Sequence, residues 1–404
     1  MKSIFSKKML VIGLMGFFSG LPLLLIGSTL KAWLTESNVD LKVVGFFSLV
    51  QIPFSFKFLW SPFMDYFSVF SLGRRRSWLI ITQVCLSLSL FALSLAHPGE
   101  SIQLVGAIAI LIAFFSASQD IVVDAYRREI LESEEQGLGS SLYINFYRLA
   151  LLFSGGIALY LADHIPWSQV YQIMAATMLL GTILTWFSPE PKIEMATQNI
   201  WGAFIEPLKE FFSRRQAWLI LAFIVLYKVG ESMASDMTTP FFLKTGFTKT
   251  EIASVVKFFG FWATVAGAFT GGVLLMRMTA GRALLLFGCL QSVALLGFSL
   301  IATHGAQVPL LGFVVSAENF TSGMAATAHL AFMANQCDRR FSATQYALLS
   351  SLMSIPRVLA GSITGILAVQ LGWQYFFVVC TLITLPGLLL IFRLGKVDPQ
   401  YKIY

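Results

Sequence analysis

The amino-acid sequence predicts an all-α membrane protein, and three observations support this prediction. Hydrophobic residues make up 56% of the 404 residues. Charged residues make up only 12%, where ordinary soluble domains carry about 25%. A soluble chain of this size would lack the polar side chains needed to cover its surface. Because one bilayer crossing takes about 20 apolar residues, there is room for about a dozen helices with short connections.

Charge and cysteine content exclude several classes of protein. The net charge is +7, but the longest basic run is Arg74–Arg76, so we attribute the surplus to cytoplasmic loops and expect no nucleic-acid partner. The four cysteines are far apart and form no C-x-x-C pair, so we expect neither a metal nor a cofactor. The sequence has no G-x-x-x-x-G-K-[ST] motif, which leaves ion coupling as the default energy source.

Apolar stretches long enough to cross a bilayer predict twelve transmembrane helices. They cover residues 9–33, 43–66, 77–96, 102–126, 138–162, 168–188, 217–242, 251–276, 282–303, 307–335, 342–370 and 374–394. Of the 28 Lys and Arg residues, 19 fall at the termini or in the loops after even-numbered helices, and only four fall in the odd-numbered loops. The positive-inside rule therefore places both termini in the cytoplasm.

An internal repeat divides the chain into two predicted halves, residues 1–188 and 217–404, joined by a cytoplasmic linker at 189–216. A shift of 209 residues superposes identical residues at three pairs of positions: Leu34 with Leu243, Arg148 with Arg357, and Gly156 with Gly365. Because the same offset relates segments that are far apart in the chain, it indicates an internal repeat. Two pseudo-symmetric six-helix halves of this kind form the major facilitator fold.

The loop after the second predicted helix contains Asp65 and, further on, the run Gly73-Arg74-Arg75-Arg76. Major facilitator proteins typically carry an acidic residue and a Gly-Arg-Arg cluster there, although the gap is longer here and Ser61 stands where a glycine is expected. Two interpretations stay open. The loop is a positive segment that only sets topology, or Asp65, Arg74 and Arg75 form a gating charge latch against a neighbouring helix end.

Ionisable groups inside membrane helices are costly and therefore mark candidate functional sites. The candidates for proton coupling lie on the fourth, seventh and tenth predicted helices, which line the central cavity in the major facilitator fold: Asp120, Asp124, Glu231 and Glu318. Asp120 and Asp124 are four residues apart and share a helix face, where two carboxylates in a low dielectric resist double ionisation. A permanent ion pair between Asp120 and Arg148 is the alternative interpretation.

Cationic and amide side chains inside the spans are candidates for substrate recognition. They are Lys57, Gln119, Arg148, Lys228, Asn319 and Arg357. The cations suit a substrate that bears carboxylates. Lys228 and Glu231 are three residues apart, so they can also pair along one face of their helix.

Several motifs, in this order along nearly the whole chain, resemble the AmpG-type muropeptide permeases of the major facilitator superfamily. The stretches that carry the resemblance are Ser19-Gly20-Leu21-Pro22, Gly45-Phe46-Phe47-Ser48-Leu49-Val50, Phe56-Lys57-Phe58-Leu59-Trp60-Ser61-Pro62, Gly73-Arg74-Arg75-Arg76, Ser116-Ala117-Ser118-Gln119-Asp120-Ile121-Val122 with Asp124, Leu226-Tyr227-Lys228, and Phe341-Ser342-Ala343-Thr344-Gln345. Together they are specific, whereas each alone is not.

The resemblance implies a non-enzymatic transporter of the bacterial inner membrane. Its cargo would be GlcNAc-1,6-anhydro-MurNAc and its peptide-bearing forms, carried from periplasm to cytoplasm by proton symport with alternating access. This import would support peptidoglycan recycling and β-lactamase induction. We expect protons and membrane lipid as the other partners, and a monomer. Two alternatives stay open: the same fold with an acyl-CoA-like or siderophore cargo, and a polytopic membrane enzyme acting on lipid-linked sugars.

Overall fold

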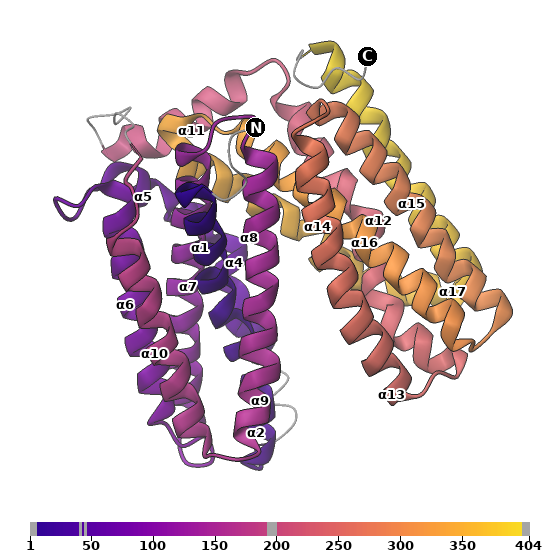
Figure 1. Cartoon of the computed structure of the whole chain (residues 1–404), viewed down its shortest axis with the longest axis horizontal. Helices are drawn as coiled ribbons and strands as arrows, with labels where there is room; N and C mark the ends of the chain where they lie inside the picture. The colour runs from indigo at the N-terminus through magenta and orange to yellow at the C-terminus, as the bar shows by residue number, and fades with distance from the viewer. Residues whose placement is uncertain (1–5, 40–42, 44–46, 192–199, 398–404) are drawn as a thin grey trace. The chain divides into compact units, whose positions relative to one another are not determined.

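The computed structural model describes residues 6–39, 43, 47–191 and 200–397, and every regular element among them is a helix (Figure 1). This confirms the predicted all-α class. The chain forms two compact units. Unit 1 comprises residues 1–133, 142–208 and 337–351, and unit 2 comprises residues 134–141, 209–336 and 352–404. These units differ from the predicted halves mainly in segment 337–351, which belongs to unit 1, and the predicted halves stay a prediction.

Unit 1 contains the helices of the first part of the chain. They are α1 (Lys7–Leu25), α2 (Ser28–Glu36), the 3-10 helix η1 (Phe47–Gln51), α4 (Ile52–Phe56), the 3-10 helix η2 (Lys57–Leu59), α5 (Ser61–Tyr66), α6 (Arg74–Ser94), α7 (Ile102–Ile130), most of α8 (Gln136–Leu151), the π-helix η3 (Leu152–Ile157), α9 (Ala158–Ala162) and α10 (Trp167–Trp186). The predicted first span at 9–33 corresponds to α1 and α2, which meet where Gly27 adopts a non-helical conformation with φ −104° and ψ −116° and together form one apolar segment, Lys7–Glu36.

Close packing of α1 against α8 depends on two glycines in unit 1. A Cβ atom on Gly16 would lie 2.5 Å from the carbonyl oxygen of Tyr143, and one on Gly20 would lie 2.7 Å from that of Tyr147. The two backbones approach this closely only because glycine has no side chain, as is typical of G-x-x-x-G pairs in membranes. Fully buried side chains such as Leu21 fill the core next to this contact.

Unit 2 contains the helices of the second part of the chain. They are α12 (Ala217–Thr245), α13 (Lys249–Ile252), the π-helix η4 (Ala253–Phe259), α14 (Gly260–Leu275), α15 (Ala280–His304), α16 (Val308–Gln336) and most of α17 (Ser342–Val397). The last element joins two predicted helices, and Gly372 separates them with φ 71° and ψ 161°. The linker helix α11 (Ile200–Ser213) and the 3-10 helix η5 (Arg339–Phe341) complete the described elements.

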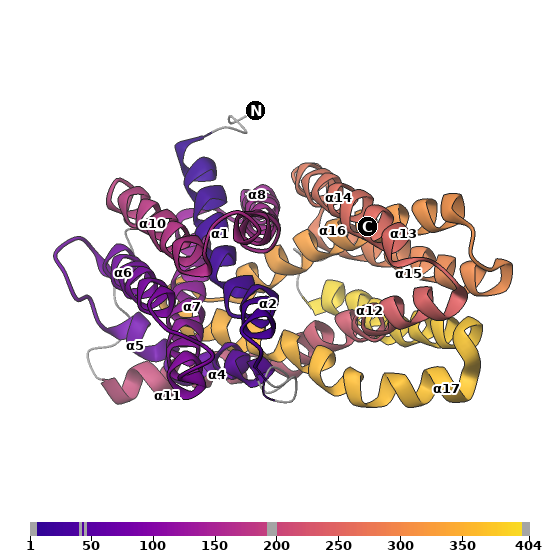
Figure 2. The ribbon, with the colours of Figure 1, turned by 90° about the horizontal axis from the view of Figure 1, so that it is seen from below.

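Helices α14 and α16 lie side by side in unit 2 (Figure 2). A Cβ atom on Gly267 would lie 1.9 Å from the carbonyl oxygen of Phe320, and one on Gly271 would lie 2.9 Å from the Cα of Met324. This is a second close approach at a G-x-x-x-G pair.

Eight helical segments in the described part of the chain are long and apolar enough to cross a membrane. They are Lys7–Glu36, Arg74–Ser94, Ile102–Ile130, Gln136–Ala162, Ala217–Thr245, Ser254–Leu275, Ala280–His304 and Leu367–Gly395. The predicted second span at 43–66 is not one continuous helix among the described residues, because η1, α4, η2 and α5 divide it into short pieces. Twelve spans therefore stay a prediction.

Candidate functional site

Asp65, at the end of α5, holds the first turn of α17 within unit 1. Its carboxylate accepts hydrogen bonds from the backbone N–H of Ala343 at 3.2 Å and from that of Thr344 at 2.8 Å. The hydroxyl of Thr344 donates a third hydrogen bond at 2.7 Å. The first N–H groups of a helix have no partner within the helix and attract negative charge. Asp65 therefore caps the start of α17.

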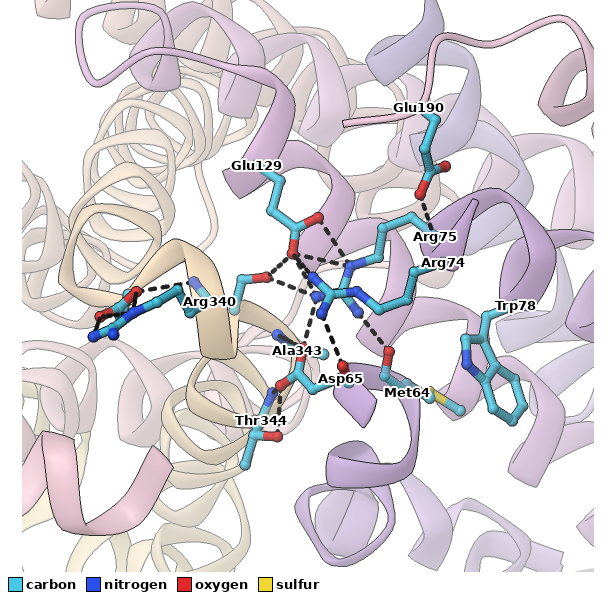
Figure 3. Close-up of polar contacts among 12 residues, drawn as sticks. Met64, Asp65, Arg74, Arg75, Trp78, Glu129, Glu190, Arg340, Ala343 and Thr344 are labelled. Atoms are coloured by element: carbon cyan, nitrogen blue, oxygen red, sulfur yellow. Dashed lines mark hydrogen bonds and ion pairs between the residues drawn. The ribbon is translucent and has the colours of Figure 1, made fainter. Parts of the chain in front are cut away.

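Arg75, in the first turn of α6, lies at the centre of this arrangement and is fully buried. It donates to Asp65 at 2.6 Å, to the carbonyl of Met64 at 2.8 Å and to the hydroxyl of Ser342 at 3.0 Å. Its Nε lies 3.0 Å from both carboxylate oxygens of Glu129, at the end of α7. Figure 3 shows the side chains of Asp65 and Glu129 directed at this guanidinium group.

Arg74 balances the charge of the arrangement. It donates to the backbone carbonyl of Asp65 at 2.8 Å and to the carboxylate of Glu129 at 3.2 Å. Two arginines thus face two carboxylates, and buried charges are tolerated when they are paired and hydrogen-bonded. We call this set the charge cluster: Asp65, Arg74, Arg75, Glu129, Ser342 and Thr344.

Gly73 and Glu190 fix the beginning of α6, which carries both arginines. Gly73 has φ +103°, and a Cβ atom there would lie 2.4 Å from the Glu190 side chain. Glu190 accepts hydrogen bonds from the backbone N–H of Arg75 at 2.8 Å and from that of Arg76 at 3.0 Å. Partial burial raises the pKa of Glu190, while these two hydrogen bonds act in the opposite direction.

The sequence predicted three members of the charge cluster and missed the others. Asp65, Arg74 and Arg75 lie together, and the gating role of the latch interpretation stays a prediction. Glu129 was not predicted, because a carboxylate in a basic segment at the end of a helix gives no signal of a partner 54 residues away. The predicted helix 342–370 begins at the same residue as α17, but its local sequence gives no signal that Ser342 and Thr344 meet α5, α6 and α7.

Asp120 lies on α7, deeper than the charge cluster along the same helix of unit 1. It accepts a hydrogen bond from the hydroxyl of Ser19 on α1, and that hydroxyl lies 3.1 Å from the hydroxyl of Tyr143 on α8. The adjacent Gln119 is only 1% exposed, and neither atom of its amide group has a hydrogen-bond partner among the described residues. Since buried polar groups are nearly always paired, this amide is available for a ligand.

Asp124, one turn further along α7, is buried between two cations. Lys57 Nζ lies 3.9 Å from its carboxylate, and Arg127 lies 3.3 Å from it. The Arg127 guanidinium also donates to the hydroxyl of Tyr346 at 2.6 Å and stacks over the ring of Tyr143 at 4.8 Å. The structure therefore brings Lys57 to an acid on α7, where the sequence analysis had assigned it to the substrate.

A second group of candidate residues lies in unit 2 around Glu231 on α12. Lys228 forms an ion pair with Glu231 one turn away on the same helix, as the spacing predicted. The hydroxyl of Ser322 on α16 donates to the other oxygen of Glu231 at 2.7 Å. Both charged side chains are mostly buried, with 14% and 16% exposed. This pair is therefore positioned by two helices.

The remaining predicted residues are distributed over both units. Asn319 on α16 accepts a hydrogen bond from Thr264 at 3.0 Å and donates to its neighbour Glu318 at 3.1 Å. Arg148 lies on α8 in unit 1 and is half-buried. Arg357 lies within α17, but its side chain is outside the described part of the structure.

Apolar helices with buried charge pairs are typical of multi-pass membrane transporters. The sequence profile of the Major Facilitator Superfamily matches residues 9–317, and the chain belongs to that superfamily. Two solved structures share the fold. A major facilitator transporter, FucP, in the outward conformation has a TM-score of 0.74 at 14% identity, covering 98% of this chain and 99% of that one. The proton:xylose symporter XylE has a TM-score of 0.73 at 12% identity, covering 96% and 95%.

Curated relatives identify the branch of the superfamily. The chain is 42% identical to the anhydromuropeptide permease of Escherichia coli K12, over 94% of this chain and 78% of the relative. It is 41% identical to an uncharacterised protein of Haemophilus influenzae over 98% and 96%, and 33% identical to putative transporter AmpG 1 of Rickettsia bellii over 96% and 98%. These matches confirm the resemblance to AmpG-type permeases that the motifs indicated.

Proposed function

We propose that this protein imports anhydro-muropeptides across the inner membrane, from periplasm to cytoplasm, as a proton-coupled secondary transporter with both termini in the cytoplasm. The observation that supports the cargo most strongly is the 42% identity to the anhydromuropeptide permease over 94% of the chain.

Two carboxylates of α7, the half-buried Asp120 and the buried Asp124, support proton coupling. A coupling site needs a carboxylate that exchanges its proton and whose charge is not permanently cancelled by a fixed cation. Asp120 meets this requirement better than Asp124, because it accepts a hydrogen bond from the neutral hydroxyl of Ser19, whereas the ion pairs of Lys57 and Arg127 are made with Asp124. We assign the proton site to Asp120. Glu318, Asp124 and Glu231 stay further candidates for proton coupling, and the last two would have to separate from their cations before they could exchange a proton.

Substrate recognition is assigned to Gln119, Asn319 and the cations of the spans. Gln119 offers an unpaired amide next to Asp120, which would place sugar or peptide hydrogen bonds beside the proton site. Lys57 and Lys228 each face an acid, so they reach a substrate carboxylate only by exchanging partners. Such an exchange would link substrate binding to the charge of the acids. Arg148 and Arg357 complete the proposed set.

The charge cluster is assigned to gating. Asp65 accepts the first N–H groups of α17, so movement of this helix start away from α5 would break three hydrogen bonds at once. Rocking of two halves about a central site is how transporters of this fold alternate access. Opening on the cytoplasmic side would then require the cluster to separate, and closing would restore it.

The test is uptake of labelled GlcNAc-1,6-anhydro-MurNAc into vesicles that contain the purified protein. We expect accumulation with an imposed inward pH gradient, equilibration without one, and no accumulation in protein-free vesicles. Accumulation that follows a sodium gradient at constant pH would contradict the proton assignment. No uptake under any gradient, in vesicles whose protein is folded, would contradict the cargo. Normal substrate binding by both Lys228→Ala and Arg148→Ala would contradict the proposal that these cations recognise the carboxylates of the substrate.

A further inference from the structure

The linker helix α11 has three distinct faces, and one of them is already in contact with protein. Ala203, Pro207 and Phe211, spaced four residues apart, are buried. Within unit 1, the carbonyl of Pro207 accepts a hydrogen bond from Gln345 at 3.1 Å. This face is therefore occupied.

A second face of α11 carries large apolar side chains that stay exposed. Trp201 is 71% exposed, Ile205 58%, Leu208 40% and Phe212 42%. Their spacing of four, three and four residues places them in one stripe along the helix, about 130° away from the buried face. Contiguous exposed apolar surface of this kind marks an interaction site. We call these four residues the apolar stripe.

The third face of α11 is polar and exposed. Glu206, Lys209 and Ser213 are exposed on it, and Arg215 follows the end of the helix. Helices that lie in a membrane interface combine an apolar stripe of this kind with a charged face. A helix that is surrounded by water on this side would not be expected to expose four large apolar side chains there.

The apolar stripe continues into the outer surface of the next membrane helix, and this continuity identifies its occupant. Within unit 2, the ring of Phe212 lies 5.4 Å from the ring of Trp218 in the first turn of α12. Trp218 is 74% exposed at the end of a helix that is long and apolar enough to cross the bilayer. Tryptophan at such a position is typical of the headgroup level. Because the apolar stripe is continuous with Trp218, we expect the stripe to face lipid as well.

We propose that α11 is an interfacial helix, which lies at the boundary between headgroups and acyl chains of the membrane with its apolar stripe in lipid and its polar face in water. The linker is then attached to the bilayer along its helical part. The occupant is the lipid surface itself, and this inference does not depend on the cargo or on proton coupling.

The experiment measures collision accessibility at single spin labels in the full chain. Cys85, Cys289, Cys337 and Cys380 are first replaced by alanine. One cysteine is then placed at Ile205 or Phe212 of the apolar stripe, or at the matched polar positions Glu206 or Ser213.

Each labelled variant is reconstituted in phosphatidylethanolamine–phosphatidylglycerol vesicles. Relaxation of the spin label by oxygen, which concentrates in lipid, is compared with its relaxation by a water-soluble nickel chelate. Unchanged melting temperatures of the variants show that labelling leaves the fold intact.

We expect oxygen to dominate severalfold at Ile205→Cys and Phe212→Cys, and nickel to dominate at Glu206→Cys and Ser213→Cys, so that the ratio reverses between adjacent positions 205 and 206. Nickel dominance at all four positions would mean that the stripe faces water and would overturn the proposal. Exclusion of both reagents at Ile205→Cys and Phe212→Cys would mean that protein covers the stripe, and this would overturn it as well.

Discussion

The carboxylate of Asp65 accepts a hydrogen bond of 2.8 Å from the backbone N–H of Thr344, although the two residues are 279 positions apart in the chain. Through the same carboxylate, Asp65 pairs with Arg75 at 2.6 Å. One buried side chain thus neutralises a buried cation and caps the start of α17. Any change to Asp65 should therefore affect both the stability of unit 1 and the position of that helix start.

The substitution Asp65→Asn removes the charge but keeps the shape. We expect it to destabilise the protein by about 3–5 kcal/mol, because breaking one partner of a buried pair leaves Arg75 with excess positive charge. The measurement is thermal unfolding in detergent, together with the uptake rate. The control is Asp163→Asn, since Asp163 is exposed in the segment after α9 and should change neither quantity. Equal melting temperatures for the two variants would argue against the charge cluster.

A glycine at position 73 is required by backbone conformation and by space. We expect Gly73→Ala to cost about 1–2 kcal/mol for the left-handed φ alone, and more because its Cβ would contact Glu190. Thermal unfolding should show a lower melting temperature than for Gly99→Ala. A Cβ at Gly99 meets its nearest atom at an ordinary 3.7 Å. If the two alanine variants melt together, Gly73 does not determine the start of α6.

The sequence predicts features that depend on composition and local spacing. The helical class, the break near Gly372 and the Lys228–Glu231 pair all follow from hydropathy, backbone preference or helix periodicity. The association of Asp65 with Arg75 was open to prediction only because a family pattern links an acid to Gly-Arg-Arg in this loop. In each case the information lies within a short segment of the chain.

Partners that come together only in the folded chain were beyond the sequence analysis. Glu129 joins the charge cluster because the end of α7 meets the start of α6, and no local pattern records this contact. Lys57 was assigned to the substrate as one of the cations inside the spans, whereas η2 carries it to Asp124. The hydroxyl of Ser19 reaches Asp120 across two helices. Each of these contacts depends on tertiary packing.

The two acids of α7 should respond differently to neutralisation. Asp124→Asn leaves Lys57 and Arg127 without their counter-charge, so we expect a clear loss of thermal stability, as for other broken buried pairs. Asp120→Asn keeps an oxygen that accepts from Ser19, so we expect nearly normal stability. In transport assays, Asp120→Asn should be the variant with the specific defect. It should lose substrate accumulation driven by a pH gradient but keep the exchange of labelled for unlabelled substrate at equal pH. Gradient-driven accumulation by Asp120→Asn at the normal rate would remove Asp120 from the coupling site.

Gln119 and Gln83 offer a matched pair of buried amides with different surroundings. The side-chain oxygen of Gln83 accepts a hydrogen bond from Thr185 at 2.9 Å, whereas neither amide atom of Gln119 has a partner among the described residues. An unpaired buried amide costs about 1–3 kcal/mol, so Gln119→Leu should melt at the same temperature as the parent or higher. Gln83→Leu loses a made hydrogen bond and should melt lower.

Substrate affinity should also distinguish the two variants, but here Gln119→Leu should be the one that is impaired. If Gln119 binds the cargo through two hydrogen bonds, its loss should raise the Kd about tenfold, which corresponds to about 1.4 kcal/mol. Gln83→Leu should leave the Kd unchanged, because its amide packs between α6 and α10. Titration calorimetry of both purified variants with GlcNAc-1,6-anhydro-MurNAc measures this. A Gln119→Leu variant that melts lower and binds normally would show that the amide serves the fold and would remove Gln119 from the proposed substrate set.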